Sequence, residues 1–203
     1  MTKLLAEVAN YYSQKLATHG LTAQGVDWNG DESQHLRFRE LCRIIDAPSF
    51  SIADLGCGYG ALIDYLAQHH HDFRYVGVDV SADMIAAATQ RYAAQQQVSF
   101  VVGDALPKSD YVVASGIFNV RQQRGDAEWF DYIISTLDSM HAASTRGFAA
   151  NFLTSYSDAE KMRDYLYYAD PLALFDHCKK HYSRHVALLH DYGLYEFTLL
   201  VRK

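Results

Sequence analysis

Three aspartates spaced 25 residues apart constrain the fold of this chain most strongly. Asp54, Asp79 and Asp104 each close a short apolar run of the length of a strand. Apolar runs of this kind are typical of parallel strands that are buried on both faces. Because the carboxyl ends of parallel strands meet at one edge of a sheet, we expect the three acids to lie along that edge.

A glycine-rich turn begins at the first of these aspartates. Residues 54–60 read Asp-Leu-Gly-Cys-Gly-Tyr-Gly, so an acid and three alternating glycines stand between a strand and a helix. Glycine lets the backbone turn tightly and approach a ligand closely. Acids at successive strand ends can accept hydrogen bonds from an amino group, a ribose and an exocyclic amine. The pattern therefore predicts a cationic nucleoside as the ligand.

A nicotinamide dinucleotide is the main alternative ligand. Residues 56–61 also satisfy the dinucleotide fingerprint, with its permitted final alanine. A pyrophosphate at the helix N-terminus needs positive potential, however, and Asp54 would oppose that anion. The Tyr-x-x-x-Lys pair of short-chain dehydrogenases occurs only at Tyr11 and Lys15, before the glycine turn. These observations favour the cationic ligand.

Composition indicates one globular domain and disfavours several partner classes. The chain has 203 residues, of which 49% are hydrophobic, and a formal net charge of -6 without a Lys/Arg run, so nucleic acid is not expected as a partner. Cys42, Cys57 and Cys178 form no C-x-x-C pair, which indicates free thiols in a reducing compartment. No apolar run reaches the length of a signal or membrane span. We expect a cytoplasmic protein without membrane contact.

Strand-like and helix-like segments alternate from residue 50, which implies βαβ crossovers and a mostly parallel, doubly wound α/β sheet. We expect strands at 50–54, 75–79, 98–102, 111–114 and 147–152, and helices from about residues 59, 81 and 126. The runs 186–189 and 195–201 flank a turn and predict a final antiparallel hairpin.

The whole chain, 1–203, is expected to form a single domain with four parts. Residues 1–49 form an N-terminal helical arm able to fold over the glycine turn, and residues 50–153 form the ligand-binding core. Residues 154–183 are expected to be a tyrosine-rich helical insertion, broken at Pro171, that acts as a lid. Residues 184–203 form the C-terminal hairpin.

From about Phe50 to Lys203 the chain resembles the class I S-adenosylmethionine-dependent methyltransferases. The resemblance implies a Rossmann-like seven-stranded sheet, S-adenosyl-L-methionine as cofactor, S-adenosyl-L-homocysteine as product, and no metal. It assigns the methionine part to the glycine turn, the ribose hydroxyls to Asp79 and the adenine amine to Asp104. The turn residues that match the family motif are Asp54, Gly56, Gly58 and Gly60.

Further residues are expected to contact the cofactor because they stand beside these motif positions or in the arm. Arg37 is a candidate clamp for the cofactor carboxylate, since a guanidinium suits bidentate contact. The segment 115–119 matches the family segment that follows the fourth strand. The other candidates are Tyr59, Val80, Met84, Gly103, Ala105, Ser115, Gly116 and Trp28.

The acceptor is expected to be a small molecule, bound by a monomer or homodimer. The Asn/Asp-Pro-Pro-Tyr/Phe box and the Pro-Cys nucleophile of nucleic-acid methyltransferases are both missing, since the only prolines are Pro48, Pro107 and Pro171. Methyl transfer from a sulfonium needs alignment above all, and a base only when the acceptor carries a proton. We expect His190 as that base, Tyr192 and Asn119 as orienting groups, and Asn151, Tyr165 and Tyr168 as substrate contacts.

Three other functions remain open. An enzyme could attack the aminocarboxypropyl chain of the same cofactor and release methylthioadenosine. A non-catalytic module would bind the cofactor without consuming it. A nicotinamide oxidoreductase would bind NADH instead. The histidines 69–71 are expected to end a helix rather than to bind a metal.

Overall fold

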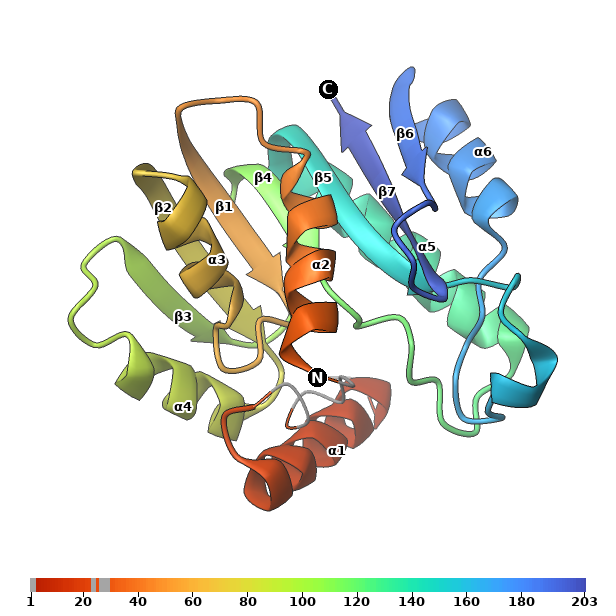
Figure 1. Cartoon of the computed structure of the whole chain (residues 1–203), viewed down its shortest axis with the longest axis horizontal. Helices are drawn as coiled ribbons and strands as arrows, with labels where there is room; N and C mark the ends of the chain where they lie inside the picture. The colour runs from red at the N-terminus through yellow and green to blue at the C-terminus, as the bar shows by residue number, and fades with distance from the viewer. Residues whose placement is uncertain (1–2, 23–24, 26–29) are drawn as a thin grey trace.

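The computed structural model describes residues 3–22, 25 and 30–203, and its centre is a seven-stranded sheet (Figure 1). The strand order is β3-β2-β1-β4-β5-β7-β6, and β7 alone runs in the direction opposite to the other strands. This arrangement confirms the predicted α/β, mostly parallel sheet with an antiparallel strand in a C-terminal hairpin. The strands are β1 (Ser49–Leu55), β2 (Asp72–Asp79), β3 (Val98–Val102), β4 (Ser109–Ala114), β5 (Ser144–Leu153), β6 (His185–Leu189) and β7 (Glu196–Arg202).

Helices cover both faces of the sheet, and each face has its own apolar core. One core joins the sheet to α2 (Asp31–Cys42), α3 (Leu62–His69) and α4 (Ala82–Arg91), through side chains such as Leu41, Ile63 and Ile85. The other joins it to α5 (Asp126–Ala143) and α6 (Pro171–His181), through side chains such as Trp129 and Leu174. Burial on both faces explains the continuous apolar runs in the central strands.

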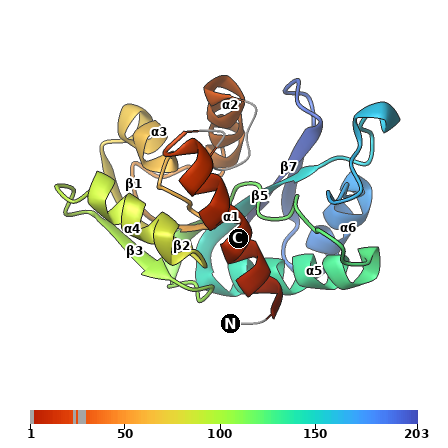
Figure 2. The same cartoon turned by 90° about the horizontal axis from the view of Figure 1, so that it is seen from below.

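The helix α1 (Lys3–His19) crosses beneath the carboxyl ends of the strands, as Figure 2 shows. Two polar contacts hold it there. Arg124 forms an ion pair with Glu7 at 2.6 Å, and the hydroxyls of Ser13 and Ser81 lie 2.9 Å apart. These two contacts place α1 against the segments that follow β4 and β2, at the strand ends that carry the glycine turn.

Side-chain caps explain where two helices begin. The Ser81 hydroxyl accepts the backbone N–H of Met84 at 3.2 Å, so the expected start of α4 is confirmed. Asp170 accepts the N–H groups of Leu172 and Ala173 at the start of α6. Pro171 occupies the first turn of that helix, where a missing N–H costs nothing.

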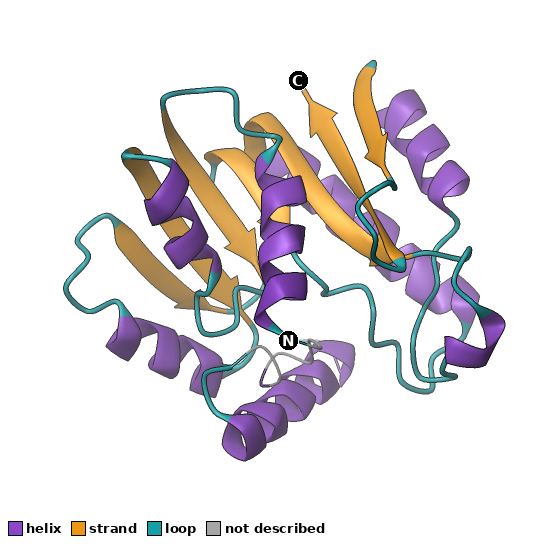
Figure 3. Ribbon diagram, viewed as in Figure 1, coloured by secondary structure: helices purple, strands orange, loops and turns teal. Residues whose placement is uncertain are grey.

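The expectation of a helix through the tyrosine-rich insertion is wrong for residues 154–170. This stretch is loop apart from one 3₁₀ turn, η2 (Ala159–Lys161), and Figure 3 shows it at the carboxyl end of the sheet. Its backbone pairs with neighbouring segments instead, through a bridge from Leu166 to Val120 and a hydrogen bond from the Ala169 N–H to the Leu153 carbonyl at 2.9 Å. Pro171 therefore begins a helix where the sequence interpretation had it break one.

No helix within the described part of the chain is both long and apolar enough to span a bilayer.

Candidate functional site

A cavity of about 310 Å³ lies at the carboxyl ends of the central strands. Its wall contains most of the residues expected to bind the cofactor, drawn from four separate strand ends. These lining residues are Asp54, Gly56, Gly58, Tyr59, Asp79, Val80, Met84, Gly103, Asp104 and Ser115. The structure thus brings together segments spread over more than sixty residues of sequence, as parallel strands require.

The glycine turn is possible only because its glycines adopt left-handed backbone angles. Gly56, Gly58 and Gly60 have φ of 73°, 55° and 82°. A Cβ on Gly56 would also lie 2.2 Å from Cγ2 of Ile117, so the turn packs directly against the segment that follows β4. Both the angle and the close approach exclude other residues at this position.

Asp54 is the most strongly perturbed carboxyl of the cavity. Its side chain is only 4% exposed, and burial raises its pKa to about 7. The hydroxyl of Tyr75 donates to Asp54 at 2.7 Å and opposes this rise, while the charge of Asp79 adds to it. A cation placed beside Asp54 would favour its ionised form, which fits an ammonium ligand.

Asp79 is held by the backbone on both of its oxygens. It accepts the N–H of Gly58 at 2.9 Å and the N–H of Ser81 at 2.8 Å. Burial raises its pKa, and these backbone N–H groups partly offset the rise. Each carboxylate oxygen retains a second lone pair, so Asp79 can still accept hydrogen bonds from ribose hydroxyls.

The third acid, Asp104, is exposed at the rim of the cavity, near the half-buried ring of Tyr132. Tyr132 belongs to a stripe on α5 that sequence reasoning missed, and burial raises the pKa of its hydroxyl to about 12. The stripe lines the cavity with Tyr132, Ser135, Thr136 and Ser139. These positions are spaced three or four residues apart in a segment predicted to be helical, so they share one face of the helix. That spacing was the sequence signal that could have identified the stripe.

The arm also supplies cavity residues that sequence reasoning did not name. Leu5, Val8 and Tyr12 of α1 line the cavity, and their spacing puts them on one helix face. Gln34 and Phe38 of α2 line it as well. Trp28, the other candidate in the arm, lies outside the described residues.

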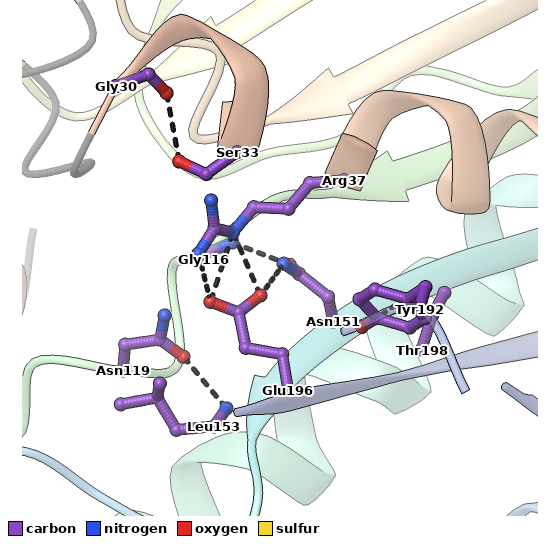
Figure 4. Close-up of polar contacts among 10 residues, drawn as sticks. All are labelled: Gly30, Ser33, Arg37, Gly116, Asn119, Asn151, Leu153, Tyr192, Glu196 and Thr198. Atoms are coloured by element: carbon purple, nitrogen blue, oxygen red, sulfur yellow. Dashed lines mark hydrogen bonds and ion pairs between the residues drawn. The ribbon is translucent and has the colours of Figure 1, made fainter. Parts of the chain in front are cut away.

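Arg37 lies behind the cavity wall and is paired with an acid. Its guanidinium donates to both oxygens of Glu196, with Nε at 3.0 and 2.9 Å and Nη2 at 2.5 Å from Oε1 (Figure 4). Glu196 Oε2 also accepts a hydrogen bond from the Asn151 amide at 2.7 Å. Asn151 in turn accepts the N–H of Gly116 at 2.8 Å. A predicted cofactor clamp and a predicted substrate contact therefore share one buried network.

The other predicted catalytic and substrate residues are absent from the cavity lining of the described chain. Asn119 accepts the N–H of Leu153 at 3.3 Å, and the buried Tyr192 hydroxyl lies 3.0 Å from that of Thr198 (Figure 4). His190 is exposed, with its ring 5.9 Å from that of Tyr156. Of the remaining candidates, Tyr165 is exposed, Tyr168 accepts the N–H of Arg163, and Gly60 and Ala105 flank lining residues.

Among residues 3–22, 25 and 30–203, no three His, Cys, Asp or Glu side chains are grouped as ligands of one ion.

Comparison with known proteins identifies relatives of this chain. A family model described as a methyltransferase domain matches residues 52–154. A protein of Mycobacterium tuberculosis that is named as a methyltransferase is 58% identical over 163 residues, which cover 79% of this chain and 98% of the relative. The matched residues of this chain include the glycine turn and all three strand-end aspartates.

Solved structures share the fold at low sequence identity. Magnesium protoporphyrin IX methyltransferase from Synechocystis, with bound S-adenosylhomocysteine, aligns with a TM-score of 0.67 and 15% identity, over 98% of this chain and 96% of its own. A complex of DhpI with SAM and HEP aligns with a TM-score of 0.67 and 16% identity over the full length of both chains. Both similarities support the fold assignment.

Proposed function

Since this chain belongs to the class I S-adenosylmethionine-dependent methyltransferase family, we propose that it binds S-adenosylmethionine in the cavity and transfers the methyl group to a small-molecule acceptor. The observation that carries the proposal is the cavity itself. Three acids from adjacent strand ends surround a glycine turn there, in a chain of net charge -6. Solved structures of the same fold carry S-adenosylmethionine or its product.

The residues of the cavity fit the parts of this cofactor. Asp54 and the glycine turn would receive the ammonium and the methionine chain, because the acid is buried and favours a cationic neighbour. Asp79 would accept the ribose hydroxyls on its remaining lone pairs. Asp104 would accept the adenine amine, with the ring between Met84 and the polar stripe of α5.

When bound, the cofactor supplies an electrophilic methyl group whose leaving group departs neutral. The protein then contributes alignment and exclusion of water. Leu5, Val8 and Tyr12 of α1 line the cavity with mostly apolar surface and would help to exclude water from it. Gly56 and Ile117 pack closely against each other and would form the wall that receives the methionine chain.

The acceptor site remains a proposal. We retain a small molecule because the chain has no long run of basic residues, and because one neighbour of the same fold is named for a porphyrin substrate. His190 is retained as the base for a protonated acceptor, with Tyr192 and Asn119 as orienting groups. The cytoplasmic location and the monomer or homodimer state likewise stay predictions.

Calorimetry tests the cofactor first. We expect S-adenosylmethionine and S-adenosylhomocysteine to bind with comparable affinity and NADH not to bind. Tight binding of NADH alone would contradict the proposal and favour an oxidoreductase.

Incubation of a metabolite extract with methyl-labelled cofactor then tests the reaction. Mass spectrometry should find one labelled small molecule together with S-adenosylhomocysteine. Release of methylthioadenosine without a methylated acceptor would instead select cleavage of the aminocarboxypropyl chain. Binding without consumption in every mixture would indicate a non-catalytic module.

A further inference from the structure

Glu196, the first residue of β7, is a charged side chain buried at the centre of the fold. It is 2% exposed and is held by the guanidinium of Arg37 from α2, a residue 159 positions away in sequence. Burying two charges is costly even when they are paired, so such a pair adds little stability relative to apolar side chains. A bidentate contact between a guanidinium and a carboxylate does, however, hold the two side chains in one relative orientation, and this orienting role is the better explanation for the pair.

The contact continues beyond the ion pair toward the segment that follows β4. Glu196 Oε2 accepts from Asn151 Nδ2 at 2.7 Å, and Asn151 Oδ1 accepts from the Gly116 N–H at 2.8 Å. Asn151 is fully buried in β5. As Figure 4 shows, one chain of hydrogen bonds thus runs from α2 through Glu196 to Gly116.

The hydrogen-bond network ends, on each side, next to residues that line the cofactor cavity. Gly116 stands between Ser115 and Ile117, which line the cavity, and Ile117 packs on the glycine turn. On α2, Gln34 and Phe38 line the cavity on either side of Arg37 in sequence. A change at Glu196 would therefore alter the spacing of two walls that it does not itself form.

We propose that Glu196 is a positioning residue for the methyltransferase reaction, acting through Arg37 and Asn151 to fix the two cavity walls. The inference rests on the proposed binding of S-adenosylmethionine in this cavity. Glu196 does not touch the cofactor in this proposal. Its effect is to hold Gly116, and with it Ser115 and Ile117, at one distance from α2.

Each hydrogen bond of this network has a fixed donor and a fixed acceptor. Substitutions that exchange a donor for an acceptor can therefore test the proposal. Arg37 and the Gly116 N–H only donate, so Glu196 must accept twice and the Asn151 amide must point its oxygen at Gly116. In Glu196→Gln the new amide must face either Arg37 or Asn151 with its N–H₂. In the first case the glutamine N–H₂ faces the guanidinium of Arg37, so that two donors meet without an acceptor. In the second case the Asn151 amide must reverse, and its N–H₂ then faces the N–H of Gly116, again with two donors and no acceptor.

Glu40 offers a matched control on the same helix as Arg37. Its carboxylate is 3% exposed and pairs with Arg39 and Arg43 at 2.8 Å, but no hydrogen bond of the described chain links it to the segment 115–119. E196Q and E40Q thus each remove one buried charge that is paired with arginine. We expect E196Q to weaken S-adenosylhomocysteine binding about tenfold in calorimetry, and E40Q to leave it nearly unchanged.

Amide hydrogen exchange supplies a readout that does not depend on the ligand. In E196Q the peptide containing residues 115–119 should exchange faster, while E40Q should leave that peptide protected. If wild-type protein does not bind S-adenosylhomocysteine, the proposed function fails, but this exchange comparison still tests the positioning role. Equal protection of 115–119 in E196Q and E40Q would overturn it.

A double variant tests whether polarity, rather than the loss of a charge, is the cause. In N151D/E196Q the carboxylate and the amide exchange places. The amide introduced on β7 then accepts from Arg37 and donates to the carboxylate introduced on β5, which accepts from Gly116. We expect this variant to recover both the protection of 115–119 and most of the S-adenosylhomocysteine affinity. A folded double variant no better than E196Q would contradict the proposal.

A second single variant keeps the test available if E196Q does not fold. N151L should produce the same loss of protection at 115–119, because it cuts the chain of hydrogen bonds while leaving the Arg37–Glu196 pair in place. Full protection of that peptide in folded N151L would count against the positioning role.

Discussion

Tyr75 donates its hydroxyl hydrogen to the carboxylate of Asp54 at 2.7 Å, and both side chains are buried on neighbouring parallel strands. Burial raises the pKa of Asp54 to about 7, and the hydrogen bond from Tyr75 limits that rise. The acid proposed to receive the cofactor ammonium therefore changes charge near neutral pH.

We expect the affinity for S-adenosylhomocysteine to increase as pH rises from about 6 to about 7.5. Asp54 is largely protonated at the lower value and ionised at the higher one, and only the ionised form attracts an ammonium. Calorimetry across this range measures the effect. In Asp54→Asn the affinity should be low and nearly independent of pH, and an unchanged pH profile in that variant would assign the titration to another group.

The same shift predicts how the stability of the ligand-free protein depends on pH. Folding raises the pKa of Asp54 from its ordinary 3.8 to about 7, so the folded state binds the proton more tightly than the unfolded state. Its stabilising contribution is complete below about pH 4 and is lost as pH rises through about 7. Denaturation midpoints should show this loss in wild type and a smaller one in D54N. A loss of equal size in both proteins would contradict the assignment to Asp54.

Tyr75→Phe should move the titration to higher pH. The substitution removes only the hydroxyl that favours the ionised carboxylate, so the pKa of Asp54 should rise further. The midpoint of the affinity profile should shift upward with it. Tyr111→Phe is the control, because Tyr111 is a buried strand tyrosine whose hydroxyl bonds to Asp46, outside the cavity lining. An equal shift in both variants would argue against the contact with Asp54.

Gly56→Ala should destabilise the protein more than Gly193→Ala. Both glycines have left-handed backbone angles, with φ of 73° and 75°, which cost alanine about 1–2 kcal/mol. A Cβ at Gly193 meets nothing within 4 Å, whereas one at Gly56 meets Ile117 at 2.2 Å and adds about 1–3 kcal/mol of overpacking. Chemical denaturation measures the difference. The double variant G56A/I117A should recover part of it, and equal losses for the two single variants would contradict the packing argument.

His190→Ala should slow turnover without weakening cofactor binding, provided that the acceptor carries a proton to be removed. The exposed side chain belongs to the residue that follows β6 and lies outside the cavity lining, so the cofactor site should remain intact. Calorimetry and the labelled-methyl assay separate the two effects. An unchanged turnover number would remove His190 from the mechanism.

Local sequence was sufficient to predict the backbone features at the strand ends that line the cavity. The glycine turn, Asp79 and the Ser81 cap depend on neighbours within a few residues, and each feature occupies its expected position. The same was true of the strands, since each is closed by its own turn residues. Features that depend only on backbone angles or on hydrogen bonds to backbone groups a few residues away can be predicted from one short segment of sequence.

Contacts between distant segments could not be predicted in this way. Nothing near Arg37 indicates Glu196, because the pair exists only after β7 has inserted beside β5. The loop 154–170 likewise resembled a helix by its composition, yet its backbone N–H groups bond to residues outside it, such as Asn119 and Leu153. Tertiary contacts, and not local secondary-structure preference, determined the conformation of these segments.

The apolar face of α1 should control retention of the cofactor. Val8 lines the cavity between Leu5 and Tyr12, so Val8→Asp would place a charge where the helix closes on the cavity. We expect about a tenfold loss of S-adenosylhomocysteine affinity in calorimetry, because α1 must withdraw to hydrate the carboxylate. Gln14→Asp adds a similar charge at an exposed position of the same helix and should leave the affinity unchanged. Similar losses in the two variants would show that helix propensity or net charge, rather than closure of the cavity by this face, determines binding.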